Sequence, residues 1–468
     1  MSMPTPGSSE LPLRIAIIGA GPAGFYAAAH LLKQKELNIE VDLYDKLPTP
    51  FGLVRGGVAP DHQKIKSVTK AYHKTAQHEN FRFYGNIELG KHLNVDDFLS
   101  YYHQVCYTIG TQTDRKLGIP GEDLERSHSA TEFVAWYNGH PDYRHLEFDL
   151  SQERVAVIGV GNVAVDVARI LCRTHNELSK TDIADYALEA LKNSNVKEVY
   201  MLGRRGPAQA AFTNPEVKEL GELEDADAFV PRDEAIPDAL SKAQLEAEPD
   251  RTTQRKLEII EGLSDNDSQT KSKRLVIRFL VSPTELIDDG TGKVGGLQLV
   301  KNELYASETG KLRPRATTTT ETLNATLVFR SVGYKGVATP GIPFNSDWGV
   351  ILNEKGRVLS EESKSIVVGQ YTAGWIKRGP SGVIGTNKAD AVETAGCMLE
   401  DAKAGNILSP DFPERAQLEE FLLTRQPELF SYERWEKLDA LELAKGASQA
   451  RPRVKFTEID AMTKVSKK

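Results

Sequence analysis

The stretch Arg14-Ile-Ala-Ile-Ile-Gly19-Ala-Gly21-Pro-Ala-Gly24 decides the fold of the first part of the chain. The segment before Gly19 is short, β-branched and mostly apolar, which is typical of a strand buried on both faces. The glycines have the spacing GxGxxG, and a helical pattern runs from Pro22 to about Lys35. The first glycine permits a tight turn, the second lets the backbone approach a pyrophosphate, and the third allows close packing of helix on strand. The stretch therefore predicts the start of a dinucleotide-binding domain.

An acidic residue follows at the position that such a domain requires. A second strand is expected at residues 39–44, and Asp45 comes directly after it, 21 residues beyond Gly24. A carboxylate at this strand end accepts hydrogen bonds from ribose hydroxyls, which favours FAD or NAD over NADP. A glycine turn alone can be purely structural, but the strand, the helix and the acid together predict a nucleotide site.

The same pattern recurs about one domain length downstream. Residues 154–159 have the pattern of a strand, Gly159-Val160-Gly161-Asn162-Val163-Ala164 has the spacing GxGxxA, and a helix is expected up to Cys172. The next strand, at residues 196–202, is followed by Gly203-Arg204-Arg205 instead of an acid. Two guanidinium groups supply the fixed charge and forked donors that an adenosine 2′-phosphate needs. This second site is therefore predicted to select NADP; the alternative is a solvated arginine pair.

Length and charge limit the remaining possibilities. A chain of 468 residues suggests roughly three domains at about 150 residues each, or fewer and larger ones. The composition, 40% hydrophobic and 26% charged, is that of a globular protein and not of a disordered or fibrous one. The net charge of −8 argues against a global nucleic-acid footprint, so no nucleic-acid partner is expected.

The cysteines and the hydropathy pattern bear on redox centres and location. Cys106, Cys172 and Cys397 are far apart and form no CxxC pair, so neither a cysteine redox pair nor a cysteine-rich metal site is expected, and no other metal site is predicted. No apolar run approaches the ~20 residues of a membrane span. Residues 1–13 match neither a signal peptide nor a mitochondrial presequence. We expect a cytoplasmic protein, with the mitochondrial matrix as the alternative if a presequence has been removed.

Two nucleotide sites of different type imply hydride exchange between a flavin and a nicotinamide cofactor. Four longer strings then carry a family resemblance: Pro50–His62, Gly159–Leu171, Gly203–Thr213 and Gly374–Gly385. On these strings the sequence is identified as a member of the adrenodoxin reductase family of ferredoxin–NADP(+) reductases. The resemblance runs from about Arg14 to the C-terminal helices, with gaps mainly in residues 222–320.

The resemblance implies an α/β fold with two Rossmann-like dinucleotide-binding domains, the NADP domain being inserted into the FAD domain. Strings of the flavin side occur at both ends of the chain, and the NADP string lies between them. The expected boundaries are residues 1–112 and 340–468 for the FAD domain and residues 113–339 for the NADP domain.

The resemblance also implies cofactor contacts at matching positions. Those expected for FAD are Gly19, Gly21, Ala23, Gly24, Asp45, Leu53, Leu89, Trp375, Gly382, Val383 and Ile384. Those expected for NADP(H) are Gly159, Val160, Gly161, Asn162, Arg204, Arg205, Glu216 and Gly382. Because an acid repels a 2′-phosphate, Glu216 is expected to contact a ribose hydroxyl or an arginine instead. Asp45 departs from the glutamate that relatives often have, and its shorter arm should still reach the ribose.

His62 and Asp166 are the candidate catalytic residues, with proton handling as their role. Histidine titrates near neutrality and can relay a proton together with a carboxylate. The alternative is that both residues only shape the pocket. We favour the alternative, because hydride transfer needs positioning more than acid–base help.

The family implies that a hydride passes from NADPH to FAD and that single electrons then pass to a small acidic iron–sulfur ferredoxin, with the reverse direction possible. An acidic partner requires a basic docking face. The candidates Arg251, Arg255 and Lys256 stand near helical spacing, and Lys271, Lys273 and Arg274 follow them. The alternative interpretation of such a charge run is a solvated surface.

Two other functions fit the two nucleotide sites. One is an NADPH-oxidising flavoprotein subunit of a larger complex, of the glutamate synthase small-subunit type. That class typically carries cysteine-rich cluster motifs, which this sequence lacks. The other is a nonenzymatic NADP(H) sensor, which a yellow protein that reduces a dye with NADPH would exclude.

Overall fold

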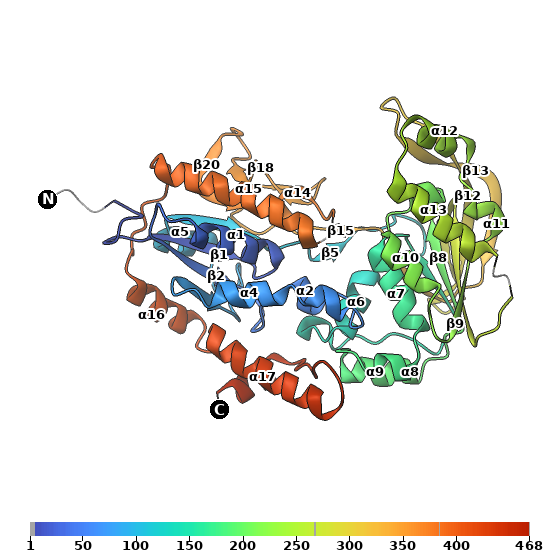
Figure 1. Cartoon of the computed structure of the whole chain (residues 1–468), viewed down its shortest axis with the longest axis horizontal. Coiled ribbons are helices and arrows are strands. Elements are labelled where there is room, and N and C mark those ends of the chain that lie inside the picture. Colours follow the sequence, from blue (N-terminus) through green and yellow to red (C-terminus); the bar gives the residue numbers. More distant parts are fainter. Residues whose placement is uncertain (1–4, 266–267, 383, 468) are drawn as a thin grey trace. The chain divides into compact units, whose positions relative to one another are not determined.

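The computed structural model describes residues 5–265, 268–382 and 384–467. Contacts between Cα atoms divide the chain into two compact units, which we describe separately. Unit 1 comprises Met1–Val58, His62–Thr113 and Tyr334–Lys468, and unit 2 comprises Ala59–Asp61 and Asp114–Gly333. Figure 1 shows the helices and strands of both units, coloured along the chain.

Unit 1 is built on a seven-stranded sheet with the order β18-β19-β20-β4-β1-β2-β3. The five strands from β20 to β3 are parallel, and the short strands β18 and β19 continue the sheet in antiparallel fashion. The strands are β1 (Leu13–Ile18), β2 (Ile39–Tyr44), β3 (Phe81–Tyr84), β4 (Gln104–Tyr107), β18 (Asn353–Glu354), β19 (Arg357–Leu359) and β20 (Ile366–Thr372).

Strand β1 explains why its sequence is an apolar run instead of an alternating pattern. Ile15 and Ile17 belong to one hydrophobic cluster, and Ala16 and Ile18 belong to another. Successive side chains of a strand point to opposite faces, so both faces of this sheet are covered. The sequence prediction of a strand buried on both faces is confirmed.

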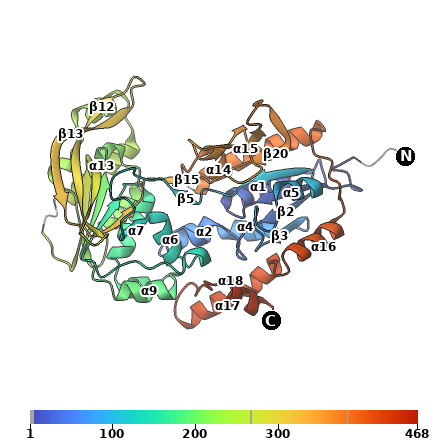
Figure 2. The ribbon, with the colours of Figure 1, turned by 180° about the vertical axis from the view of Figure 1, so that it is seen from behind.

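The helices of unit 1 come from both ends of the chain. Helix α15 packs along α1, although more than 300 residues separate them in sequence (Figures 1 and 2). The helices are α1 (Pro22–Lys33), α2 (Leu53–Gly56), α3 (Gln63–Lys66), α4 (Thr69–Ala76), α5 (Val95–Tyr101), α14 (Trp375–Arg378), α15 (Ile384–Lys403), α16 (Arg415–Arg425), α17 (Tyr432–Ser448) and α18 (Ile459–Ser466).

Unit 2 has a six-stranded parallel sheet with the order β6-β14-β7-β8-β10-β9. The strands are β6 (Ser127–Ser129), β7 (Arg154–Ile158), β8 (Glu198–Gly203), β9 (Ala226–Phe229), β10 (Lys273–Phe279) and β14 (Leu327–Arg330). The helices are α6 (Ala130–Tyr137), α7 (Asn162–Cys172), α8 (His175–Leu178), α9 (Asp185–Lys192), α10 (Asn214–Leu220), α11 (Arg232–Ala235), α12 (Ala239–Ala247) and α13 (Arg251–Ser264).

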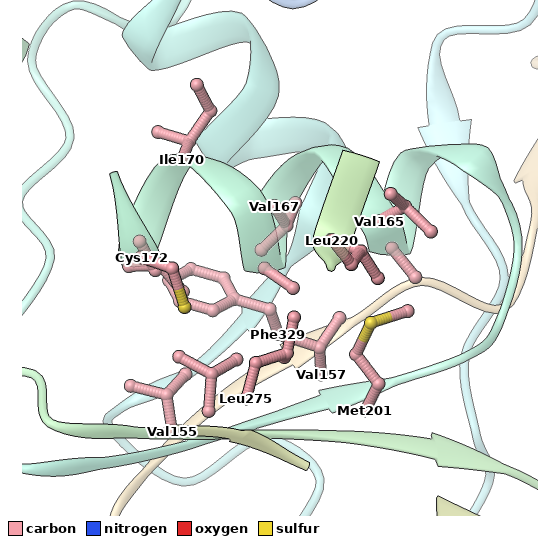
Figure 3. Packing of buried hydrophobic residues seen from close by; sticks show 14 of the residues in the cluster. Val155, Val157, Val165, Val167, Ile170, Cys172, Met201, Leu220, Leu275 and Phe329 are labelled. Atoms are coloured by element: carbon pink, nitrogen blue, oxygen red, sulfur yellow. The ribbon is translucent and has the colours of Figure 1, made fainter. Parts of the chain in front are cut away.

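The core of unit 2 repeats the arrangement of unit 1. Figure 3 shows Val165 and Val167 of α7 above Val157 and Met201 of the sheet. The neighbouring Ala156 belongs to a cluster on the opposite face. The chain therefore holds two Rossmann-type α/β sheets, which confirms the predicted α/β class, while the insertion of an NADP domain into an FAD domain stays a prediction.

Residues 222–272 contain regular structure, including β9 and helices α11 to α13. A second, antiparallel sheet follows, with the order β11-β12-β13, formed by Val281–Asp288, Val294–Ala306 and Leu312–Leu323. The remaining short elements are β5 (Thr113–Asp114), β15 (Tyr334–Lys335), β16 (Phe344–Asn345), β17 (Val350–Ile351), η1 (Pro141–Tyr143) and η2 (Pro207–Gln209).

The cysteines and the hydropathy of the helices can be compared with what the sequence indicated. Cys106, Cys172 and Cys397 are free thiols and are buried, as small hydrophobic side chains are. Among the described residues, no helix has the length and hydropathy that a membrane span requires.

Candidate functional site

The glycine turn of unit 1 has a backbone that only glycine fits at two positions. Gly19 has a φ of +112°, and a Cβ there would lie 2.4 Å from the carbonyl oxygen of Thr108. A Cβ at Gly24 would lie 2.2 Å from the carbonyl oxygen of Gly19. These glycines therefore let β1, the turn and α1 approach one another, as the spacing predicts.

The middle glycine of this turn faces open space. A Cβ at Gly21 would meet no atom within 4 Å. Gly21 is also the N-cap of α1 and provides no side-chain hydrogen bond to the first turn of the helix. The free N–H groups and the positive end of the helix dipole form a site for an anion such as a pyrophosphate.

Asp45 organises the turn from the end of β2. One carboxylate oxygen, Oδ2, accepts a hydrogen bond of 2.8 Å from the Ala20 amide, and Oδ1 accepts one of 2.9 Å from the Leu47 amide. Burial raises the pKa of this carboxyl group, and the two amides partly offset that shift. Each oxygen has a second lone pair, which can accept a hydrogen bond from a ribose hydroxyl. The contact with the ribose stays a prediction.

The flavin-side segments from the two ends of the chain meet in unit 1. Gly374, with a φ of +80°, approaches Ala23 so closely that a Cβ at Gly374 would lie 2.7 Å from the Cβ of Ala23. Leu53 is 39% exposed, which is high for a leucine in a helix that packs on the core. Leu89 is half-buried against the cluster that contains Tyr44. The fold thus assembles Ala23 and the Gly374 segment, while the contacts of Leu53 and Leu89 with FAD stay predictions.

Trp375 has a buried polar group that lacks a hydrogen-bond partner among the described residues. Its ring lies beside that of Tyr334, with centroids 5.4 Å apart, and its Nε1 is buried without a hydrogen-bond partner among the described residues. A buried indole N–H normally finds an acceptor. A flavin ring, which carries carbonyl and nitrogen acceptors, fits this requirement. The residues of unit 1 therefore fit a bound FAD.

The other predicted residues of this segment are less informative. Gly382 has a φ of +80°, where a Cβ would lie 2.3 Å from Oγ1 of Thr386, so glycine is required there. Ile384 is the first residue of α15 and is half-buried. Val383 lies outside the described residues.

An ion cluster that sequence reasoning missed, in which the side chains of Lys377 and Asp390 are largely buried, supports the turn before Trp375. Asp390 of α15 accepts a hydrogen bond of 2.5 Å from the Gly374 amide and lies 3.1 Å from Nζ of Lys377. Lys377 also contacts Glu393 at 2.6 Å. Lys377 stands inside the string Gly374–Gly385, but no local pattern indicates its acidic partners.

A second cluster that sequence reasoning missed holds α2, the helix that contains the predicted FAD contact Leu53. Arg55 makes a bidentate ion pair with Glu442 of α17, at 2.6 and 2.8 Å. Glu442 is fully buried, also contacts Arg453 at 3.0 Å, and accepts the Phe456 amide at 2.8 Å. The C-terminal helices are therefore part of the support of the candidate FAD site.

The glycine turn of unit 2 repeats the geometry of the first. Gly159 has a φ of +137°, and a Cβ there would lie 2.2 Å from the carbonyl oxygen of Ser331. A Cβ at Gly161, the N-cap of α7, would meet no atom within 4 Å. Ala164 is completely buried at the third position of the motif. This turn also offers an uncapped helix N-terminus to an anion.

The string Gly203–Thr213 is tied back to this turn. The carbonyl oxygen of Val160 accepts hydrogen bonds from the amides of Ala211 and Phe212, at 2.9 and 3.1 Å. Asn162 Oδ1 accepts the Thr213 amide at 2.9 Å. The backbone therefore brings the segment that follows Arg204 and Arg205 to the mouth of the turn.

Arg204 is exposed and Arg205 is half-buried, and among the described residues neither side chain has an acidic partner. Burial, Arg204 and a third guanidinium, Arg313 of β13, lower the pKa of Arg205. The carbonyl oxygen of Arg204 accepts a hydrogen bond of 2.9 Å from Nδ2 of Asn302. An unpaired arginine pair on a fixed backbone matches what a 2′-phosphate needs. Arg313 was not predicted, because the turn of a distant hairpin brings it close.

The remaining predicted residues of unit 2 gather around one arginine. Glu216 and Asp166 contact Arg169 at 3.2 and 2.7 Å. Of the two partners expected for Glu216, a ribose hydroxyl or an arginine, the structure shows the arginine. His62 is the N-cap of α3 in unit 1. Its role in proton handling stays a prediction.

The docking prediction needs a correction at one position. Arg251 and Arg255 are exposed on α13, and Arg255 pairs with Glu258 at 2.6 Å. Lys256 is buried, and its Nζ donates a hydrogen bond of 2.5 Å to the carbonyl oxygen of Ala210. It therefore cannot share an exposed face with the other two, because residues one position apart on a helix do not face the same side.

Comparisons with known proteins agree with this geometry. A family described as "Pyridine nucleotide-disulphide oxidoreductase" matches residues 13–202. The NADPH-ferredoxin reductase FprA of Mycobacterium tuberculosis (strain ATCC 25618 / H37Rv) is 43% identical over 463 residues, covering 97% of this chain and 99% of the relative. The mitochondrial NADPH:adrenodoxin oxidoreductase of Arabidopsis thaliana is 41% identical, covering 96% of this chain and 94% of the relative. The structure of M. tuberculosis FprA in complex with NADPH has a TM-score of 0.91 at 42% identity, covering 98% of this chain and 100% of that chain.

Proposed function

The chain belongs to the NADPH–ferredoxin reductase family, which includes the adrenodoxin oxidoreductases, and from this premise we propose that it is an FAD-containing ferredoxin–NADP(+) reductase. The prediction of the family from four sequence strings is confirmed. The relatives carry the name of the reductase and are matched over nearly their whole length. This favours the reductase over the flavoprotein subunit of a larger complex.

One observation carries the proposal. The two glycine turns are alike in backbone, but Asp45 follows the strand in unit 1 and Arg204-Arg205 follow it in unit 2. Adenosine without a 2′-phosphate suits the acid, and adenosine with one suits the arginines. The chain therefore has one site suited to FAD and another suited to NADP(H).

The residues of unit 1 would hold the flavin cofactor. The N-terminus of α1, beside Gly21, would bind the pyrophosphate, and Asp45 fixes the turn through its two amide contacts. Trp375 would donate its buried N–H to the ring system. When bound, FAD supplies the chemistry that accepts a hydride and releases electrons one at a time.

The residues of unit 2 would hold NADP(H). Gly159 and Gly161 let the backbone approach the pyrophosphate, and Arg204 and Arg205 would bind the 2′-phosphate. These contacts orient the dinucleotide, and orientation is the main contribution that a protein makes to hydride transfer. For His62 and Asp166 the favoured role remains shaping the pocket, and proton handling is the alternative, which the pH dependence of turnover in His62→Gln and Asp166→Asn variants would test.

The partner is proposed to be a small acidic iron–sulfur ferredoxin. The exposed guanidinium groups of Arg251 and Arg255 support a basic docking face on α13. Arg251→Glu with Arg255→Glu should impair ferredoxin reduction and spare dye reduction, because only the protein partner depends on this surface. A matched control is Lys192→Glu, which reverses an exposed charge on α9. Equal loss of both activities in the double variant would remove the docking role.

The location is proposed to be the cytoplasm, with the mitochondrial matrix as the alternative. The low cysteine count and the free, buried thiols suit a reducing compartment. Subcellular fractionation with an antibody against the native chain would distinguish the two compartments.

The test of the proposed function is steady-state turnover of the purified protein. A yellow protein that reduces ferredoxins and a dye with NADPH, strongly preferring it to NADH, is the expected result. Activity against several ferredoxins should fall as salt rises, because the docking is electrostatic. A colourless protein, or one that oxidises NADPH and NADH equally well, would contradict the proposal.

A further inference from the structure

Arg169, on α7 of unit 2, lies at the centre of a buried group of carboxylates. Its side chain is 0% exposed. Nε lies 2.8 Å from Asp61, Nη2 lies 2.7 Å from Asp166, and Nη1 lies 3.2 Å from Glu216 and 3.5 Å from Glu219. One guanidinium thus contacts acids from three segments, namely residues 59–61, α7 and α10.

Among the described residues, the ion pairs of this cluster join five carboxylates to two guanidinium groups. The second arginine nearby, Arg173, contacts Asp61 at 2.7 Å and Glu177 at 2.6 Å. Two guanidinium groups therefore face the carboxylates of Asp61, Asp166, Glu216, Glu219 and Glu177. Burying ionised carboxylates is costly unless they are paired. Although burial acts in the opposite direction, Asp166 and Asp61 raise the pKa of Arg169, so its charge is permanent.

The position of the cluster connects it to the second glycine turn. Helix α7 starts at that turn, and its N-terminal residue Asn162 accepts the amide of Thr213, which is the N-cap of α10. Arg169, on α7, joins the same two helices through its ion pairs with Glu216 and Glu219 of α10. The hydrogen bond at one end and the ion pairs further along therefore fix the relative position of α7 and α10.

We propose that Arg169 is a positioning residue for NADP(H): it orients Asp166 and Glu216 and offsets a negative charge that would otherwise oppose the dinucleotide phosphates. This inference rests on the proposed function. A planar fork with five donors can bind carboxylates in three directions at once. The ammonium group of lysine is a point charge and cannot reproduce that arrangement.

The experiment compares Arg169→Gln and Arg169→Lys with Arg173→Gln as the matched control. Arg173→Gln removes a guanidinium that shares Asp61 but forms no ion pair with Asp166 or Glu216 among the described residues. The Kd of NADP+ is measured on the FAD-loaded protein between pH 6 and pH 8.5, at about 0.1 M ionic strength. Steady-state KM and kcat for NADPH with a dye are measured on the same preparations.

Arg169→Gln is expected to weaken NADP+ binding about 10- to 100-fold at the high end of the pH range. The loss should shrink, relative to the wild-type protein, as the pH falls, because proton uptake near the site reduces the negative charge that the missing guanidinium no longer offsets. Arg169→Lys should show a smaller loss with a flatter pH dependence. Arg173→Gln should lose clearly less affinity than Arg169→Gln throughout, because within the described part of the chain Arg173 shares Asp61 but forms an ion pair with neither Asp166 nor Glu216.

Equal NADP+ affinity and pH dependence in Arg169→Gln and Arg173→Gln would overturn the proposal. If Arg169→Gln yields no folded protein, Arg169→Lys carries the test, and wild-type affinity and pH dependence in that variant would also overturn it. A wild-type protein that neither binds NADP+ nor reduces a dye with NADPH would contradict the proposed function instead. The two failures are therefore distinguishable.

Discussion

The two glycine turns share a backbone and differ in what surrounds it. In both turns the first glycine has a positive φ, +112° at Gly19 and +137° at Gly159, and faces a carbonyl oxygen from a neighbouring strand end. In both, the second glycine borders open space. The shared part is thus the part that any dinucleotide pyrophosphate uses.

The differences lie at the third position and at the end of the following strand. Gly24 leaves no room for a Cβ, whereas Ala164 fits one. The first turn is closed by the carboxylate of Asp45, and the second is followed by the arginine pair Arg204-Arg205. The comparison leads us to predict that the turn supplies affinity for a dinucleotide, while the residue at the strand end decides which dinucleotide binds.

The supports of the two turns differ as well. In unit 1 the segment after the turn is held by Arg55 and Glu442, residues 387 positions apart in the chain. In unit 2 the helix after the turn is held by Arg169 and its carboxylates. Both supports are buried ion pairs, so both should respond strongly to removal of one partner.

We expect the largest effect from Gly24→Val, which should disrupt the glycine turn of unit 1 and leave that of unit 2 unchanged. The Cβ would lie 2.2 Å from the Gly19 oxygen and 3.1 Å from Cδ1 of Leu43, so α1 cannot keep its place on β1. We expect complete loss of bound FAD and a fall in the free energy of unfolding of more than about 3 kcal/mol. Flavin absorbance and urea unfolding measure these effects. A yellow variant of normal stability would contradict the assignment of the turn.

The next effect is expected from Glu442→Gln, which removes the support in unit 1. Among the described residues it leaves Arg55 without a charge partner, while Arg453 keeps only its ion pair with Asp439 at 2.6 Å, and the free energy of unfolding should fall by about 3–5 kcal/mol. The control is Glu433→Gln on the same helix, whose exposed pair with Lys437 is worth about 0.5 kcal/mol. Equal losses in the two variants would refute the role of the buried pair.

The pH dependence of that loss follows from the pKa of Glu442. Although burial acts in the opposite direction, Arg55 and Arg453 lower the pKa of Glu442 below its ordinary value. The stabilisation is therefore present above the unfolded pKa, about 4.3, and is lost as the pH falls through the lower folded value. The difference between the wild type and Glu442→Gln, measured by urea unfolding, should shrink below about pH 4.

A slightly smaller effect is expected from Arg204→Ala combined with Arg205→Ala, which should leave the second turn intact and remove its selectivity. The KM of NADPH should rise about 10²- to 10³-fold, while that of NADH changes little, because only NADPH carries the 2′-phosphate. Steady-state kinetics with both nucleotides is the measurement. An unchanged preference for NADPH would refute the assignment.

The smallest effect is expected from Ala164→Gly, which makes the third position of the second turn resemble the first. The cost should be about 1 kcal/mol of unfolding free energy, from the lower helix propensity of glycine. NADP+ affinity, measured by titration, should stay within about twofold. A loss of unfolding free energy as large as that of Gly24→Val would contradict the expected difference between the third positions of the two turns.

Local patterns predicted the two Rossmann-type sheets and both glycine turns, because strand, turn and helix are adjacent in sequence. They did not predict Glu442 as the partner of Arg55 or Asp390 as that of Lys377. Ion pairs between distant segments leave no periodic trace. Lys256 is a different case: it lies one and two helical turns before Ile260 and Ser264, which are also buried, so the helical period could have shown that it faces inward.

Unit 1 is discontinuous along the chain, and this has a consequence for synthesis. Strand β4 pairs with β1 on one side and with β20 on the other, but β20 leaves the ribosome only after all of Asp114–Gly333. At about 5–20 residues per second, β4 waits on the order of tens of seconds for its neighbour, exposing an open sheet edge. Unit 2 is almost continuous and needs no such delay. A nascent chain stalled before residue 366 would therefore carry a finished second unit and an unfinished first one, the form on which chaperones act.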